Sequence, residues 1–154
     1  MKITIFLLLF AVLFAFAACE DENEYGENET KISENFSDES HKTGQNCMEC
    51  HVNGGRGEGW FTVAGSVYND QLTDSAPNGI VKLTTEPQAG GNVIVSVEVD
   101  EKGNFYTTEP IDFGDGLYAT LESQTGTKNY MQSKVLTGAC NSCHGSSTDR
   151  IRVE

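Results

Sequence analysis

The fold of this chain is indicated by the stretch Val93-Ile94-Val95-Ser96-Val97-Glu98-Val99. Valine fills every second position of the stretch, and one isoleucine and two polar residues stand between the valines. Successive side chains of a β-strand point to opposite faces of a sheet, so the four valines share one face. The pattern therefore predicts a strand over residues 93–99 whose valine face is buried.

Five further segments look like strands, and together they place a β-domain in the middle of the chain. They are rich in β-branched and aromatic residues and span residues 60–68, 80–85, 105–108, 117–123 and 130–135. Glycine-containing turns separate them, and Pro77, Pro87 and Pro110 fall between strands, where no hydrogen bond of the sheet is lost. Short strands at this spacing predict a small all-β sandwich over residues 60–135.

Residues 62–125 of this domain also carry four short motifs. These are Gly65-Ser66-Val67-Tyr68, Pro77-Asn78-Gly79-Ile80-Val81-Lys82-Leu83, Asp100-Glu101-Lys102-Gly103-Asn104-Phe105 and Leu117-Tyr118-Ala119-Thr120. With them the stretch resembles the carboxypeptidase regulatory-like, or transthyretin-like, family of small sandwiches. The resemblance implies a transthyretin/Ig-like sandwich that serves as a scaffold or adhesion module. It implies no reaction, because no catalytic residue maps onto this chain.

Two copies of one short motif flank the β-domain. They are Cys47-Met48-Glu49-Cys50-His51 and Cys140-Asn141-Ser142-Cys143-His144. Cys-x-x-Cys-His is the attachment signature of c-type haem, in which two thiols form thioethers with the porphyrin and the adjacent imidazole becomes an axial ligand of the iron. The repeat predicts two covalently attached haem c groups, held by two loop-rich segments, residues 41–59 and 136–154.

Other chemistries use pairs of cysteines, and they remain alternatives. Four thiolates could hold zinc, but 89 residues separate Cys50 from Cys140, whereas zinc ribbons separate their pairs by about 15–20 residues. A thioredoxin-like redox pair is expected once, beside a βαβ pattern. Neither alternative accounts for His51 and His144. The third possibility is that the pairs form disulfides in a protein that binds no haem.

The axial ligands of the two irons cannot be equal within one chain. Two six-coordinate sites need four ligands, and the sequence contains three histidines. His51 and His144 are the ligands that the motifs provide. His41 is the candidate sixth ligand of the first site, and Met131 or an open position is the candidate at the second. A solvent-exposed His41 and a core-filling Met131 are the structural alternatives.

The N-terminus predicts export and a lipid anchor. Residues 1–18 form a leader with Lys2 as its positive end and an apolar run that is short for a membrane span. The run ends in Phe16-Ala17-Ala18-Cys19, which resembles the lipobox of bacterial lipoproteins and implies a lipid on Cys19. Residues 19–40 read as an acidic, unfolded tether. Acidic residues after the lipidated cysteine also resemble the surface-export signal of Bacteroidota lipoproteins.

Charge restricts the partners. The net charge of −13 becomes −14 once Lys2 is removed with the leader, so nucleic acid is an unsuitable partner and basic proteins are favoured. These observations predict an outer-membrane lipoprotein, periplasmic or surface-exposed, that carries single electrons to redox proteins or extracellular acceptors. The alternative is a haem-free binding or adhesion lipoprotein. A dihaem peroxidase is a third option, although the sequence offers no catalytic acid–base group for it.

Overall fold

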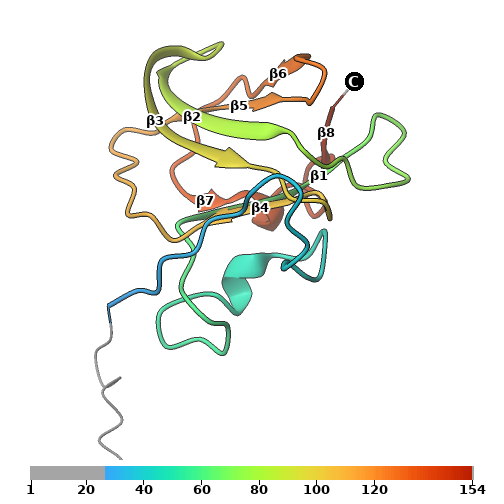
Figure 1. The fold of residues 1–154 in the computed structure, drawn as a ribbon. Helices are drawn as coiled ribbons and strands as arrows, with labels where there is room; N and C mark the ends of the chain where they lie inside the picture. Colours follow the sequence, from blue (N-terminus) through green and yellow to red (C-terminus); the bar gives the residue numbers. More distant parts are fainter. Residues whose placement is uncertain (1–26, 154) are drawn as a thin grey trace, which may run out of the picture.

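The computed structural model describes residues 27–153, which form strands and almost no helix (Figure 1). The strands are β1 (Val63–Tyr68), β2 (Ile80–Glu86), β3 (Gly90–Glu98), β4 (Asn104–Thr107), β5 (Tyr118–Glu122), β6 (Lys128–Tyr130), β7 (Gly138–Ala139) and β8 (Ile151–Arg152). Two single 3-10 turns are η1 (Cys47–Glu49) and η2 (Cys140–Ser142). Within the described range, no helix has the length and apolarity needed to cross a membrane. The predictions for the leader and for Cys19 concern residues outside this range.

The strands are arranged in two sheets, which lie one above the other in Figure 1. The first sheet has the order β4-β1-β7, and β8 also pairs with β1. Strand β1 runs antiparallel to β4 and parallel to β7 and β8. The second sheet is antiparallel throughout and has the order β3-β2-β5-β6. The prediction of a β-rich chain is confirmed at this level.

The apolar core takes side chains from both sheets. Its members are Val63, Val67 and Phe105 from the first sheet, Val81, Leu83, Val95, Val97 and Leu121 from the second, and Val99 and Leu117 beside the strands. Each buried valine, leucine or phenylalanine contributes about 1.5–3 kcal/mol relative to an exposed one. The two sheets are therefore held together by apolar contacts, and of the two motifs only Cys140 packs against this core.

The predicted strand over residues 93–99 differs from the observed one at its start. Val95, Val97 and Val99 are buried as expected, whereas Val93 is 55% exposed. The reason is a bulge, because Leu83 of β2 faces Val95 while the next residue of β2 faces Val93. The extra residue between them bends the strand, so its first part leaves the core.

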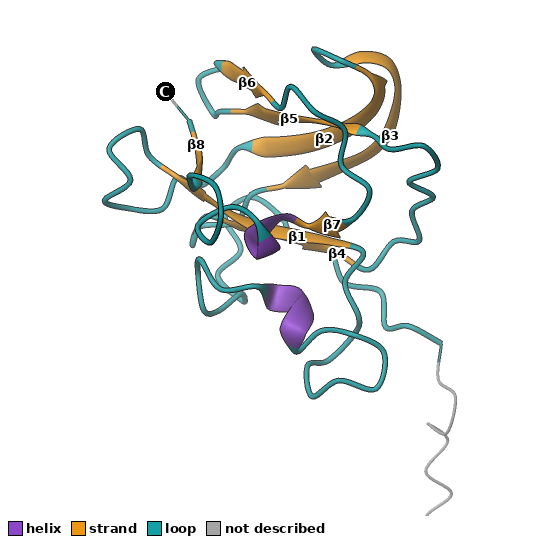
Figure 2. Ribbon diagram, turned by 180° about the vertical axis from the view of Figure 1, so that it is seen from behind, coloured by secondary structure: helices purple, strands orange, loops and turns teal. Residues whose placement is uncertain are grey.

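Two other predicted strands also change. The strand predicted over residues 130–135 is wrong for most of its length, because β6 ends at Tyr130 and beyond it only an isolated bridge joins Val135 to Leu117. Strands β7 and β8 were not predicted, because two residues show no periodicity. Both pair with β1 (Figure 2), and in this way the C-terminal segment returns to the centre of the first sheet.

Residues 28–40, here called the N-terminal strap, lie along the free edge of β4. Ile32 forms a bridge with Thr107, and Ser33 donates its backbone N–H to Tyr106 O at 2.9 Å. The Ser33 side chain is 1% exposed, and its hydroxyl donates to Glu98 O at 2.6 Å. The tether predicted for residues 19–40 therefore does not extend through the strap, which covers an edge that would otherwise be unpaired.

Candidate functional site

The two Cys-x-x-Cys-His motifs adopt the same local backbone. In the first, Cys47 O accepts hydrogen bonds from the backbone N–H groups of Cys50 and His51, at 3.2 and 3.0 Å. In the second, Cys140 O accepts from Cys143 and His144, at 3.2 and 2.9 Å. Each motif thus closes one tight turn, η1 or η2, which brings its two cysteines and its histidine together. All four cysteines are free thiols.

The imidazoles of both motifs are oriented by a backbone carbonyl. His51 Nδ1 lies 3.0 Å from Glu58 O, and His144 Nδ1 lies 2.7 Å from Asp149 O. A carbonyl oxygen can only accept a hydrogen bond, so Nδ1 must carry the proton in each ring. In the neutral imidazole Nε2 then keeps its lone pair, which is the form that binds a metal.

The glycine-rich run after the first motif fits closely around His51. A Cβ atom on Gly57 would lie 2.7 Å from atoms of the His51 ring, so a side chain there would displace the imidazole. The Phe61 ring stacks on the His51 ring, with centroids 4.1 Å apart and an angle of 7° between the two planes. His51 is thus held by a hydrogen bond, a close backbone and an aromatic contact.

A large cavity opens beside the first motif. Its volume is about 880 Å³, and its walls include the N-terminal strap together with His41, Cys47, Cys50, His51, Phe61 and Tyr106. Its charged lining consists of three basic residues and five acidic ones, namely Lys31, Lys42, Arg56, Glu29, Glu34, Glu39, Glu49 and Glu58. Cavities that hold cofactors usually measure roughly 300–1,000 Å³ and combine apolar walls with a few polar groups. The cavity therefore has the size and the lining of a cofactor site.

His41 lies across this cavity from the first motif. Its ring centroid is 5.8 Å from that of His51, and the two planes are inclined by 39°. Two imidazoles on one metal have metal–nitrogen bonds of about 2 Å, which separates their ring centres by about 6 Å. The structure thus brings together the two histidines that the sequence assigned to the first site.

Met131 is placed elsewhere. It follows β6 and donates its backbone N–H to Ala119 O, at 2.9 Å, in the second sheet. His144 follows η2, which packs against β1 in the first sheet. The two residues predicted to share the second site thus belong to different sheets.

The thiols differ in their surroundings. Burial raises the pKa of the Cys140 thiol to about 12, with a smaller contribution from repulsion by Cys47, although the residue keeps some exposed surface. Burial also raises the pKa of Cys47. Cys143 is exposed, and Cys50 accepts a hydrogen bond from Arg56 Nε at 3.2 Å. In each motif, therefore, partial burial raises the pKa of the first cysteine, and in the second motif the second cysteine is also the more exposed of the two.

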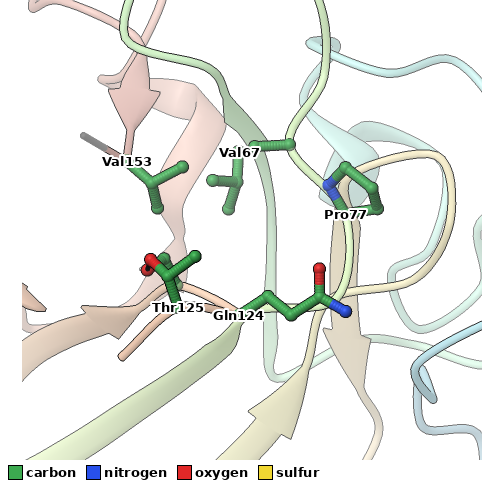
Figure 3. A pocket seen from close by; sticks show the side chains of 8 residues that line it. Val67, Pro77, Gln124, Thr125 and Val153 are labelled. Carbon is green, nitrogen blue, oxygen red and sulfur yellow. Dashed lines mark hydrogen bonds between the residues drawn. The ribbon is translucent and has the colours of Figure 1, made fainter. Parts of the chain in front are cut away.

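Within residues 27–153, no three Cys, His, Asp or Glu side chains converge to form a metal site. The tetrahedral arrangement that the zinc alternative needs is therefore not seen in this part of the chain. A second cavity of about 170 Å³ lies between β1 and the turn after β5 (Figure 3). Its labelled residues are Val67, Pro77, Gln124, Thr125 and Val153, none of which carries an ionisable group.

Several residues of the site were not singled out from the sequence. They are the carbonyls of Glu58 and Asp149, the ring of Tyr106 and the buried Asn141 inside the second motif. Backbone carbonyls leave no sequence signal, because every residue has one. An asparagine between two motif cysteines was visible, but its burial depends on the neighbouring β1.

In comparisons with known proteins, no family model, no curated protein and no solved structure matches the chain.

Proposed function

We propose that the chain carries two covalently attached haem c groups, one at each motif, and works as a one-electron carrier at the cell envelope. The observation that carries the proposal is the shared orientation of His51 and His144. Their Nδ1 partners stand at different distances along the chain, seven residues after the first histidine and five after the second. Two different loops thus supply the same carbonyl contact, which metal-ligating histidines require.

Each residue of the motifs has a definite part in this proposal. Each motif would hold its own porphyrin through two thioethers. Cys47 and Cys50 would add their S–H groups across the two vinyl groups of the first porphyrin, and Cys140 and Cys143 would do the same at the second. Addition of a thiol to a vinyl group needs no oxidant. His51 and His144 provide the axial nitrogens, and His41 is the second nitrogen at the first site. When bound, haem supplies the exchange of single electrons between its ferric and ferrous states.

The first site fits the cofactor best. The cavity is large enough, Phe61 and Tyr106 form an aromatic wall, and their rings stack with centroids 4.8 Å apart. Lys42, which lines the cavity, is suited to the carboxylate of a haem propionate. Lys31 is paired with Glu58 and Glu29, and Arg56 donates to Cys50 Sγ. These features support a haem that is enclosed on one side and open to a partner on the other.

The remaining predictions complete the proposal. The two sheets form a small transthyretin/Ig-like sandwich, which the shared apolar core supports. Cys19 carries a lipid that anchors the protein to the outer membrane. The acidic chain favours redox partners with basic surfaces, or extracellular acceptors reached through bound cations.

The test is a pyridine haemochrome spectrum and an intact mass, measured on protein made in a host with haem-attachment machinery. Wild type should contain two haems. The double variants Cys47→Ala/Cys50→Ala and Cys140→Ala/Cys143→Ala are matched to each other, and each should retain one. A wild type without the c-type α-band would contradict the proposal. Zinc content and thiol titration of the same sample would then distinguish zinc from disulfides at the cysteine pairs.

The lipid is tested separately, because haem attachment does not depend on it. Intact mass should show acyl chains on wild type and none on Cys19→Ala, while both haem increments remain. Wild type without acyl mass would contradict the lipid anchor and leave the haem proposal intact.

A further inference from the structure

Three buried polar side chains link the two motifs through the first sheet. They are Asn141 in η2, Ser66 in β1 and Asn104 in β4, which are 7%, 1% and 2% exposed. A buried polar group costs free energy unless it is hydrogen-bonded. The hydrogen-bond partners of these three residues therefore show which segments of the chain they join.

Asn141 joins the second motif to the chain just before the first. Its Oδ1 accepts from Ser66 N at 3.1 Å, and its Nδ2 donates to Ser66 Oγ at 3.0 Å. The same Nδ2 donates to Gln45 O at 2.9 Å, two residues before Cys47. The motifs are far apart in sequence, yet both turns lie beside β1 (Figure 2).

Asn104 joins the same group to the loop that carries His41. Its Nδ2 donates to Ser40 Oγ at 2.8 Å and to Thr43 Oγ1 at 2.9 Å, on either side of His41. Its Oδ1 accepts from Ser66 Oγ at 2.6 Å. The backbone around His41 is therefore fixed to β4, although the imidazole itself is exposed.

The Ser66 hydroxyl is the centre of the network. It donates to Asn104 and accepts from both Asn141 and Gly44 N, the latter at 2.8 Å. A hydroxyl has one donor and two acceptor positions, so all of its capacity is used. Removing the Ser66 hydroxyl would therefore take one hydrogen-bond partner from Asn104, from Asn141 and from Gly44.

We infer that Asn141, Ser66 and Asn104 are positioning residues that hold the His41 loop and both attachment segments as one unit, so that the two haems behave as an interacting pair. This inference rests on the proposed function. The hydrogen bond from Asn141 Nδ2 to Gln45 O supports it, because it joins a residue inside the second motif to the chain two residues before the first motif. A change at Ser66, which belongs to neither motif, must then reach both haems.

The experiment compares Ser66→Ala with a matched control, Thr84→Val. Thr84 is also fully buried, and its hydroxyl donates to Glu86 O at 2.8 Å, but it lies on β2 in the second sheet. Both variants remove one buried, hydrogen-bonded hydroxyl, so both should lower the unfolding temperature of the haem-free protein. Haem content, electron paramagnetic resonance spectra and potentiometric titrations are then recorded for wild type and both variants.

Ser66→Ala should keep two haems but lose part of the low-spin signal of the first site, because the His41 loop is loosened. Both of its reduction waves should also shift. Thr84→Val should match wild type in both measurements. If Ser66→Ala keeps wild-type spectra and waves, or changes one haem only, the inference is overturned while the proposed function stands. A wild type that binds no haem overturns both.

Asn141→Ala decides the matter if Ser66→Ala does not fold. It leaves the hydroxyl of Ser66 bonded to Asn104, and its informative readout is the first haem, whose ligands lie in the other motif. A shifted first wave supports the network, and an unchanged first wave overturns it.

Discussion

The two attachment segments share a motif and a local backbone but differ in everything around them. The first opens on a cavity of about 880 Å³, faces His41 and packs its imidazole between Gly57 and Phe61. The second has its imidazole held by Asp149 O, and its sequence-predicted partner Met131 lies in the other sheet. If both motifs hold haem as proposed, the motif would supply the attachment and one ligand, whereas the sixth ligand would depend on what the fold places on the opposite side.

Under the proposed function, this difference predicts two unequal haems. We expect a site with two imidazoles at the first motif and an open or exchangeable position at the second. A second imidazole holds the potential lower than weaker ligation does, so two separate reduction waves are expected. The following predictions, from the largest effect to the smallest, either remove this inequality or measure it.

The largest effect is expected from Val97→Asp, which removes the support of both segments at once. Val97 is 0% exposed in the core, so the variant buries a charge without a partner. We expect a loss of about 3–5 kcal/mol in the free energy of unfolding. Denaturant unfolding measures it, and Val93→Asp is the matched control, because Val93 is 55% exposed. Equal losses in the two variants would contradict the observed bulge.

A large effect confined to one site is expected from His41→Ala. Loss of the second imidazole should convert the first haem from low spin to high spin and move its reduction wave to a higher potential. Optical spectra and potentiometry measure both changes, and the second haem serves as an internal control. A change in both waves of equal size would mean that His41 does not belong to the first site alone.

An intermediate effect is expected from Gly57→Ala. The new methyl group would lie 2.7 Å from the His51 ring, so the imidazole must move or the loop must open. Such overpacking costs about 1–3 kcal/mol. We expect a broadened signal from the first haem and an unchanged second haem, seen by magnetic resonance of the oxidised protein. Unchanged spectra would show that the loop adapts without moving His51.

The smallest effect is expected from Met131→Leu. Because Met131 is bonded to Ala119 at the end of β6, the variant should leave both reduction waves and both optical spectra as in wild type. Added imidazole should bind at the second haem in both proteins. A loss of low-spin signal in Met131→Leu would restore Met131 as a ligand of the second site.

The sequence predicted the β-rich class well, because alternation in β3 and the turn residues between strands are local signals. It could not predict the exposure of Val93, which depends on an extra residue in the pairing with β2. It also missed β7 and β8, since two-residue strands exist only through their pairing with β1. Register and non-local pairing belong to the folded chain and not to any single segment.

The site was predictable to the same extent. Cysteine and histidine spacing named both motifs, and the small number of histidines directed attention to His41, which the structure places 5.8 Å from the His51 ring. The Met131 candidate rested on chain order alone, and chain order does not place residues in space. The acidic composition of the strap indicated an unfolded tether, but Ser33 and Asn28 find backbone partners on the sheet and beside Trp60.

The position of the strap has a consequence for the reach of a lipid-anchored protein. The side-chain amide of Asn28 donates from Nδ2 to Trp60 O at 2.7 Å, and its Oδ1 accepts from Trp60 N at 2.9 Å. These two hydrogen bonds attach Asn28 to the folded domain. Eight residues lie between Cys19 and Asn28, and a fully extended chain over these nine Cα–Cα steps would span at most about 30 Å. With a lipid on Cys19, this length would limit the distance between the bilayer surface and the domain that carries the first site. Under the proposed function, the protein would then exchange electrons with partners that reach the membrane surface. The length of the connecting segment would set the distance from the membrane at which a partner can contact the protein.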